Sequence, residues 1–219
     1  MKQSKIREED LYWQEVETRH LVQDEWIDFR STTYHYPDGR EFSPFYSFSR
    51  QDYVVIAATD EQGNYICVRQ FRWGIRQVTN EFPAGGIEDK DSTREEDPKQ
   101  QTDGSGRLDR IRRPDPAGAE QIEKALAAAK RELSEETGYV SDEWKFLMVL
   151  PSYATMSDNY AYLFQAKNCR LQEALDLDDT ECLRPLLYSK EEMEDLIGKG
   201  QFQQTTSLLA WYLIQNQKR

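Results

Sequence analysis

The run Arg131-Glu-Leu-Ser-Glu-Glu-Thr-Gly138 limits the fold and the chemistry of this chain more than any other segment. On an α-helix, residues three and four positions apart lie on the same face, so Glu132, Glu135 and Glu136 bring three carboxylates together. Gly138 then stands where a helix commonly ends on a left-handed residue. The pattern predicts a helix that presents a cluster of negative charge near its carboxyl end.

A second stripe on the same segment is apolar. Its residues follow one another at spacings of four, three and four positions, as on the buried side of an amphipathic helix: Ile122, Leu126, Ala129 and Leu133. The predicted helix therefore runs from about residue 120 to residue 137, with one side buried and the acidic side next to it.

Three carboxylates this close repel one another and need a positive partner. Hard divalent cations, Mg²⁺ above all, bind through oxygen atoms of this kind. The alternative is a solvated helix face, which is what most glutamate-rich helices present. The spacing alone leaves both interpretations open.

Motifs on both sides of the helix resemble those of the Nudix hydrolase family, whose consensus reads G-x5-E-x7-R-E-U-x-E-E-x-G-U, with U a bulky apolar residue. Arg131 to Gly138 is similar to its second half, and Glu123 stands eight residues ahead of Arg131. Upstream, Glu81-Phe-Pro-Ala-Gly-Gly86 and Arg69-Gln-Phe-Arg72 resemble the strands before the box in ADP-ribose and nucleotide-sugar pyrophosphatases. The resemblance extends from about residue 13 to residue 162.

The resemblance implies an α+β fold: a Nudix-type α/β/α sandwich with a mixed sheet, plus an N-terminal antiparallel β-sheet element. We expect residues 1–50 to be the β-strand element and 51–219 the hydrolase domain. Residues 11–50 are rich in aromatic and β-branched residues and contain the turn signal Tyr36-Pro-Asp-Gly39, as strands require. In related enzymes such an element joins two subunits, so a homodimer is expected.

The implied reaction is Mg²⁺-dependent hydrolysis of the diphosphate bond in ADP-ribose or a related nucleoside diphosphate sugar. It gives a nucleoside monophosphate and a sugar phosphate, and Mn²⁺ is an alternative metal. By resemblance, Glu132 and Glu136 are the principal metal ligands, Glu135 is a third, and the backbone carbonyl of Ala84 is another. Arg131 and Glu123 would have a structural role, fixing the loop against the helix.

The catalytic base is less directly implied. Related enzymes carry a glutamate in the loop after the box, but the aligned residue here is Asn159, which cannot accept a proton in that role. Asp158 is the neighbouring carboxylate and the first candidate, and Glu135 is the alternative.

Three residues are expected to contact the substrate. Arg72 suits bidentate contact with the diphosphate, and Gly86 lets the backbone approach a ligand closely. Trp26 resembles the aromatic residue that stacks on the nucleobase in dimeric relatives, with ordinary packing as its alternative.

Residues 88–119 fall inside the box and interrupt it. They are nearly free of apolar side chains, as is typical of a loop without a packed core. Gly85 is too distant to serve as the glycine of the consensus, and Gly118 stands one position away from the required place. Asp91 is an alternative to Glu123 for the first glutamate of the box. We expect a flexible insertion at the strand-to-helix turn, whose deletion from about 92 to 114 leaves the protein folded.

Charge and composition exclude some classes of function. The net charge of −12 argues against nonspecific binding to nucleic acid or to an anionic membrane. No stretch approaches 18 apolar residues, and Cys67, Cys169 and Cys182 lack metal-type spacing, which favours reduced thiols in the cytoplasm. Two alternatives to the expected small-molecule hydrolase are a pyrophosphatase for a different nucleoside diphosphate derivative and a Nudix-fold sensor that binds nucleotide sugars without cleaving them.

Overall fold

The computed structural model describes residues 7, 10–24, 26–91, 115–172 and 182–216, and the chain divides into two compact units. Unit 1 is Met1–Gln51 with Pro151–Asn159, and unit 2 is Asp52–Leu150 with Tyr160–Arg219. The segment Pro151–Asn159 thus groups with the N-terminal strands rather than with the residues around it in sequence. Of the expected insertion at 88–119, residues 92–114, which its deletion would remove, lie outside the described residues.

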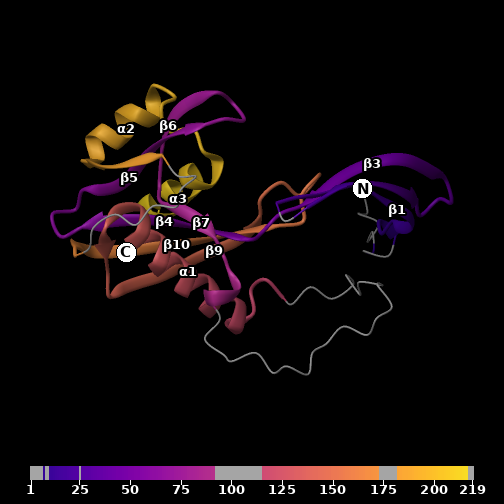
Figure 1. Cartoon of the computed structure of the whole chain (residues 1–219), viewed down its shortest axis with the longest axis horizontal. Coiled ribbons are helices and arrows are strands. Elements are labelled where there is room, and N and C mark those ends of the chain that lie inside the picture. The colour runs from indigo at the N-terminus through magenta and orange to yellow at the C-terminus, as the bar shows by residue number, and fades with distance from the viewer. Residues whose placement is uncertain (1–6, 8–9, 25, 92–114, 173–181, 217–219) are drawn as a thin grey trace, which may run out of the picture. The chain divides into compact units, whose positions relative to one another are not determined.

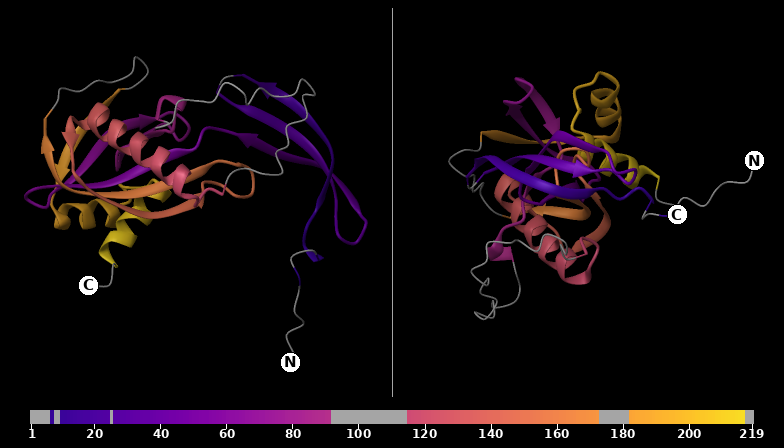
Figure 2. Two further views of the ribbon diagram at one scale, coloured as in Figure 1. Left: turned by 90° about the horizontal axis from the view of Figure 1, so that it is seen from below. Right: turned by 90° about the vertical axis from the view of Figure 1, so that its right-hand side faces the viewer.

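Unit 1 is built on an antiparallel sheet with the strand order β1 (Gln14–Gln23), β2 (Asp28–His35) and β3 (Glu41–Ser49). Figure 2 shows these indigo strands side by side. The predicted turn joins β2 to β3: Gly39 has φ 82° and donates its N–H to the Tyr36 carbonyl. Aromatic side chains pack against one another on this sheet: Trp13, Tyr34, Tyr36, Phe42 and Phe45.

Unit 2 is a mixed sheet covered by helices. Its strands are β4 (Tyr53–Asp60), β5 (Tyr65–Arg72), β6 (Gln77–Glu81), β7 (Ala84–Gly86), β8 (Tyr139–Val140), β9 (Glu143–Pro151), whose last residue belongs to unit 1, β10 (Tyr160–Leu171) and β11 (Leu183–Tyr188). The central strand β4 runs parallel to β10 and antiparallel to β5 and β7. A short 3-10 turn, η2 (Asp89–Asp91), follows β7.

The described helices are α1 (Ala119–Thr137), α2 (Lys190–Gly198) and α3 (Thr205–Gln215). α1 ends as predicted, because Gly138 is left-handed at φ 72° and donates its N–H to the Ser134 carbonyl. Ser189 caps α2 with a complete capping box. None of the described helices is long and apolar enough to cross a membrane.

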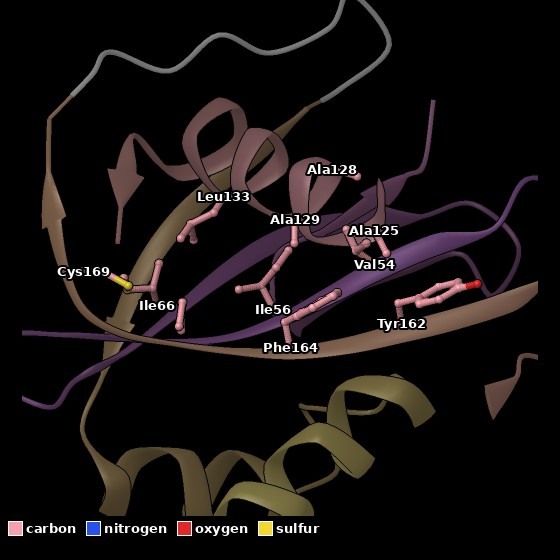
Figure 3. Packing of buried hydrophobic residues seen from close by; sticks show 12 residues of the cluster. Val54, Ile56, Ile66, Ala125, Ala128, Ala129, Leu133, Tyr162, Phe164 and Cys169 are labelled. Carbon is pink, nitrogen blue, oxygen red and sulfur yellow. The ribbon is translucent and has the colours of Figure 1, made fainter. Parts of the chain in front are cut away.

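The residues of β4 alternate between two cores, which explains why its sequence is apolar almost throughout. Val54 and Ile56 pack with α1, whereas Val55 and Ala57 pack with α2 and α3 on the other face. Figure 1 shows α1 on one side of the sheet and α2 and α3 on the other, and Figure 3 shows Ala129 and the side chains around it on the α1 side. Unit 2 is therefore an α/β/α sandwich.

Small residues let α1 approach the sheet closely. Ala129 and Leu133, from the predicted stripe, are fully buried, and so are Ala125 and Ala128. Ile122 and Leu126 are only partly buried at the edge of this core. The helix therefore meets the sheet mainly through alanine, and its acidic residues come close to the strands as well.

Candidate active site

The acidic face of α1 is largely buried. Glu132 is 6% exposed and Glu136 is 2% exposed, whereas Glu135 is partly exposed. A solvated helix face therefore does not describe Glu132 or Glu136. Burying two like charges one turn apart is costly unless each has polar partners.

The strand β7 supplies backbone contacts for both buried carboxylates. The Ala84 N–H donates to Glu136 Oε2 at 3.0 Å. A side-chain carbon placed on Gly85 would lie 2.0 Å from Glu132 Cδ. Gly85 does not have a positive φ, so its glycine is required for close approach and not for an unusual backbone conformation.

Arg131 connects the acidic face of α1 to the chain that follows β7. Its Nη1 donates to Glu132 Oε1 and to Glu135 Oε2, both at 2.7 Å. Its Nη2 donates to the Gly86 carbonyl at 2.9 Å, and Nε and Nη2 bind the two oxygens of Asp91 at 3.0 and 3.1 Å. One guanidinium thereby orients two carboxylates and is itself oriented by Asp91.

These contacts shift the pKa values of both charged partners. Burial alone would lower the pKa of Arg131, but Asp91, Glu132 and Glu135 raise it above its ordinary value. Burial would raise the pKa of Asp91, but hydrogen bonds from Arg131 and from the Glu88 N–H hold it below its usual range. Both groups are therefore charged near neutral pH.

Of the two candidates for the first acidic residue of the box, Asp91 and not Glu123 binds Arg131 in the part of the chain that the structure describes. Glu123 lies on the exposed side of α1. Asp91 is 6% exposed at the end of η2, directly before the segment outside the described residues. The contact follows the alternative assignment of the first acidic residue of the box.

Arg72 is paired with a buried carboxylate. Its Nε donates to Glu81 Oε1 at 2.9 Å, its Nη2 donates to Glu81 Oε2 at 2.5 Å, and Thr79 Oγ1 also donates to Glu81. The hydrogen bond to Glu81 raises the pKa of Arg72 despite burial, and the charges of Glu81 and Glu136 act in the same direction. Arg72 is thus a permanent cation near the carboxylates of α1.

The remaining candidates belong to unit 1. Trp26 is 72% exposed within the described residues, so ordinary packing does not account for its side chain. Asp24 Oδ1 accepts from the backbone N–H groups of Trp26 and Ile27, both at 2.9 Å, which holds the backbone of Trp26.

Asp158 is held within unit 1 by two residues of its strands. Arg30 Nη2 donates to Asp158 Oδ2 at 3.1 Å, and Ser49 Oγ donates to the same oxygen at 2.5 Å. Asn159 Nδ2 donates to the Gln51 carbonyl. These contacts tie Pro151–Asn159 to the N-terminal sheet.

The residues at β7 and α1 fit a hard divalent cation by the chemistry of their donors. Carboxylate oxygens of Glu132 and Glu136 lie next to the backbone of Ala84 and Gly85, and Mg²⁺ and Mn²⁺ prefer carboxylate and carbonyl oxygen. Among the described residues, no group of three or more His, Cys, Asp or Glu side chains is arranged around a single point for a metal ion. Arg131 draws Glu132 and Glu135 toward itself instead.

Sequence reasoning assigned no role to Glu81 or Thr79. The signal was available in part, since Glu81 ends a strand and stands two positions from Thr79, so both side chains point to the same face. The alternation of side chains along β6 does not identify the partner of Glu81, because Arg72 lies on the neighbouring strand.

Comparison with known proteins shows the fold. No family model and no curated protein matches this sequence. A crystal structure of an ADP compounds hydrolase matches with a TM-score of 0.68 and 16% sequence identity, over 93% of this chain and 92% of that chain. The chain therefore has the fold predicted from its sequence, a mixed-sheet α/β/α sandwich with an additional antiparallel sheet.

Proposed function

We propose that this protein is a Nudix-type hydrolase that requires Mg²⁺, or Mn²⁺ in its place, and cleaves the diphosphate bridge of ADP-ribose or a related nucleoside diphosphate sugar. The products are a nucleoside monophosphate and a sugar phosphate. The fold shared with an ADP compounds hydrolase supports the class of substrate.

One observation carries this proposal. Two buried carboxylates, Glu132 and Glu136, lie against the backbone of Ala84 and Gly85, and the cations Arg131 and Arg72 lie near them. Such a cluster of acids and arginines suits a metal ion together with an anionic ligand. The same cluster would contribute little to the stability of the fold, because the desolvation of buried charges usually costs as much free energy as their pairing returns.

In this proposal Glu132, Glu136, Glu135 and the Ala84 carbonyl would hold the metal. When bound, Mg²⁺ offsets the negative charge of the diphosphate and lowers the pKa of a water molecule. Arg131 keeps Glu132 and Glu135 in place, and Gly86 contributes backbone that no side chain shields from the ligand.

Glu135 is the preferred base, because it lies on the same helix face as the proposed metal ligands Glu132 and Glu136. Glu135 and Asp158 are otherwise alike, since each is partly exposed and each accepts a hydrogen bond from an arginine. The base removes a proton from water, the water oxygen bonds to one phosphorus, and the bridging P–O bond to that phosphorus breaks. The bridging oxygen leaves on the other phosphate. Arg72 would bind the diphosphate and Trp26 would stack on the nucleobase.

The exposed aromatic side chains of unit 1 support a homodimer formed through its strands, with Trp26, Tyr46 and Phe42 among the large exposed residues. Light scattering coupled to size-exclusion chromatography tests this proposal. A mass of one subunit at micromolar concentration would contradict it.

The activity is tested by release of nucleoside monophosphate from a panel of nucleoside diphosphate sugars with Mg²⁺. We expect Glu136→Gln to lower kcat at least 10³-fold and to leave the circular dichroism spectrum unchanged, because the amide keeps the shape of the side chain but loses its charge. Glu123→Gln is the matched control on the exposed side of α1 and should retain wild-type kcat.

Two outcomes would overturn the proposal. Wild-type kcat in Glu136→Gln would remove the metal assignment. Saturable binding of nucleotide sugars without turnover under any of these conditions would identify the protein as a sensor.

A further inference from the structure

Glu81 is a buried charge that the proposed reaction does not use directly. It is 1% exposed, and it ends β6 only three residues before Ala84. A buried carboxylate costs several kcal/mol unless it is paired and hydrogen-bonded. Its position beside the candidate site therefore requires a physical reason.

Both oxygens of Glu81 are engaged by side chains of the same sheet face. On β5 and β6, positions 68, 70 and 72 share a face with positions 77, 79 and 81 because of the strand alternation and the pairing of Val68 with Glu81. Arg72 binds both oxygens through Nε and Nη2, and Thr79 donates to Oε1. This arrangement fixes the plane of the guanidinium.

The pairing leaves one side of Arg72 available. Within the described residues, Arg72 Nη1 donates no hydrogen bond, and the Arg72 side chain is 36% exposed while that of Glu81 is 1% exposed. The charge of Glu136 helps to raise the pKa of Arg72, and Glu136 itself accepts from the Ala84 N–H on β7.

We propose that Glu81 is a positioning residue: it holds Nε and Nη2 of Arg72 so that the Nη1 edge faces the diphosphate group of the substrate. Thr79 in turn fixes Glu81. The inference rests on the proposed function for the identity of the ligand, a nucleoside diphosphate, but it concerns how the anion is bound and not how it is cleaved.

A guanidinium held in one orientation loses less freedom when it binds a phosphate than one that moves among several rotamers. Glu81→Gln keeps the shape of the side chain but removes its charge and one acceptor for the guanidinium. We expect the Kd for ADP, measured by calorimetry with Mg²⁺ and well below the melting temperature, to rise about tenfold. The KM for ADP-ribose should rise with it.

Arg72→Gln provides the decisive comparison, because a positioning residue acts only through its partner. In the Arg72→Gln background, Glu81→Gln should change the Kd for ADP by less than about twofold, as a double-mutant cycle requires for coupled residues. Arg69→Gln, an exposed arginine on the opposite face of β5, is the control for lost charge and should leave the Kd unchanged.

Thr79→Val is a milder variant if Glu81→Gln does not fold, and it should raise the Kd for ADP about threefold by removing one hydrogen bond to Glu81. A purely structural Glu81 predicts a lower melting temperature with a wild-type Kd in the folded protein, and that result would overturn the inference. Equal effects of Glu81→Gln with and without Arg72 would overturn it as well. Failure of the proposed function would give a different result. The protein would release no nucleoside monophosphate, while the Kd for ADP would still change in the Glu81 and Arg72 variants.

Discussion

The carboxylate of Glu132 lies against the α-carbon of Gly85, in the space that any other side chain would fill. The contact explains why a glycine follows Pro83-Ala84 at position 85. A substitution at Gly85 should affect activity and stability differently, because the atoms that it would meet belong to the flexible end of Glu132 and not to the backbone.

Gly85→Ala should therefore impair catalysis more than folding. The new methyl group displaces the Glu132 carboxylate, and a shift of about 1 Å in a catalytic group can cost about 100-fold in rate. The backbone of Gly85 is not left-handed, so alanine is tolerated there. Steady-state kinetics with Mg²⁺ and thermal melting measure the two effects.

Gly74→Ala is the control for this prediction, since a side-chain carbon at Gly74 meets nothing within 4 Å. It should retain wild-type kcat. A Gly85→Ala variant with the same kcat as the control would show that the position of Glu132 does not matter for the proposed reaction.

At the scale of the elements, α1 depends on small residues where it meets the sheet. Ala128 is fully buried, and α1 packs on β4 and β7. Ala128→Leu should destabilise the protein by about 1–3 kcal/mol, because extra methyl groups in a close-packed core force neighbouring side chains apart. Urea unfolding followed by circular dichroism measures the change.

Ala119→Leu makes the same substitution at an exposed position in the first turn of α1. Leucine is nearly as good a helix former as alanine, so the free energy of unfolding should change by less than about 0.5 kcal/mol. Equal losses at positions 119 and 128 would argue against close packing of α1 on the sheet.

The elements that the sequence predicted are those with local signals. The end of α1 at Gly138 and the turn at Gly39 each depend on residues within a few positions of one another. The far end of β10 had no such signal. It extends to Leu171 because β4 and β8 provide backbone partners, and those partners are distant in sequence.

The same distinction applies to the candidate site. One turn of helix was enough to predict that Glu132, Glu135 and Glu136 lie together. The partner of Arg131 was not predictable to a single residue, because Asp91 and Glu123 both suit the motif and only the three-dimensional structure distinguishes them. Glu81 was missed for a similar reason, since its pairing crosses between strands.

At the scale of the whole molecule, burial divides the thiols into two classes. Cys67 and Cys169 are buried, and Cys182 is exposed. Burial raises the pKa of Cys169 to about 11 and raises that of Cys67 as well, because the thiolate is disfavoured without water. A raised pKa leaves little thiolate below pH 9.

The folded protein at pH 8 should therefore react rapidly with Ellman's reagent at one thiol, Cys182, out of the three in the sequence. All three should react in guanidinium chloride. Cys182→Ser should abolish the rapid phase, and a variant that still shows it would mean that a buried cysteine is accessible.

The bond between Asp91 and Arg131 joins residues 40 positions apart. Because the acid precedes residues 92–114 and the guanidinium follows them, the helix keeps its orientation whatever number of residues connects the two. The length of that connection is then free to vary without a change in the contacts that hold the carboxylates of α1.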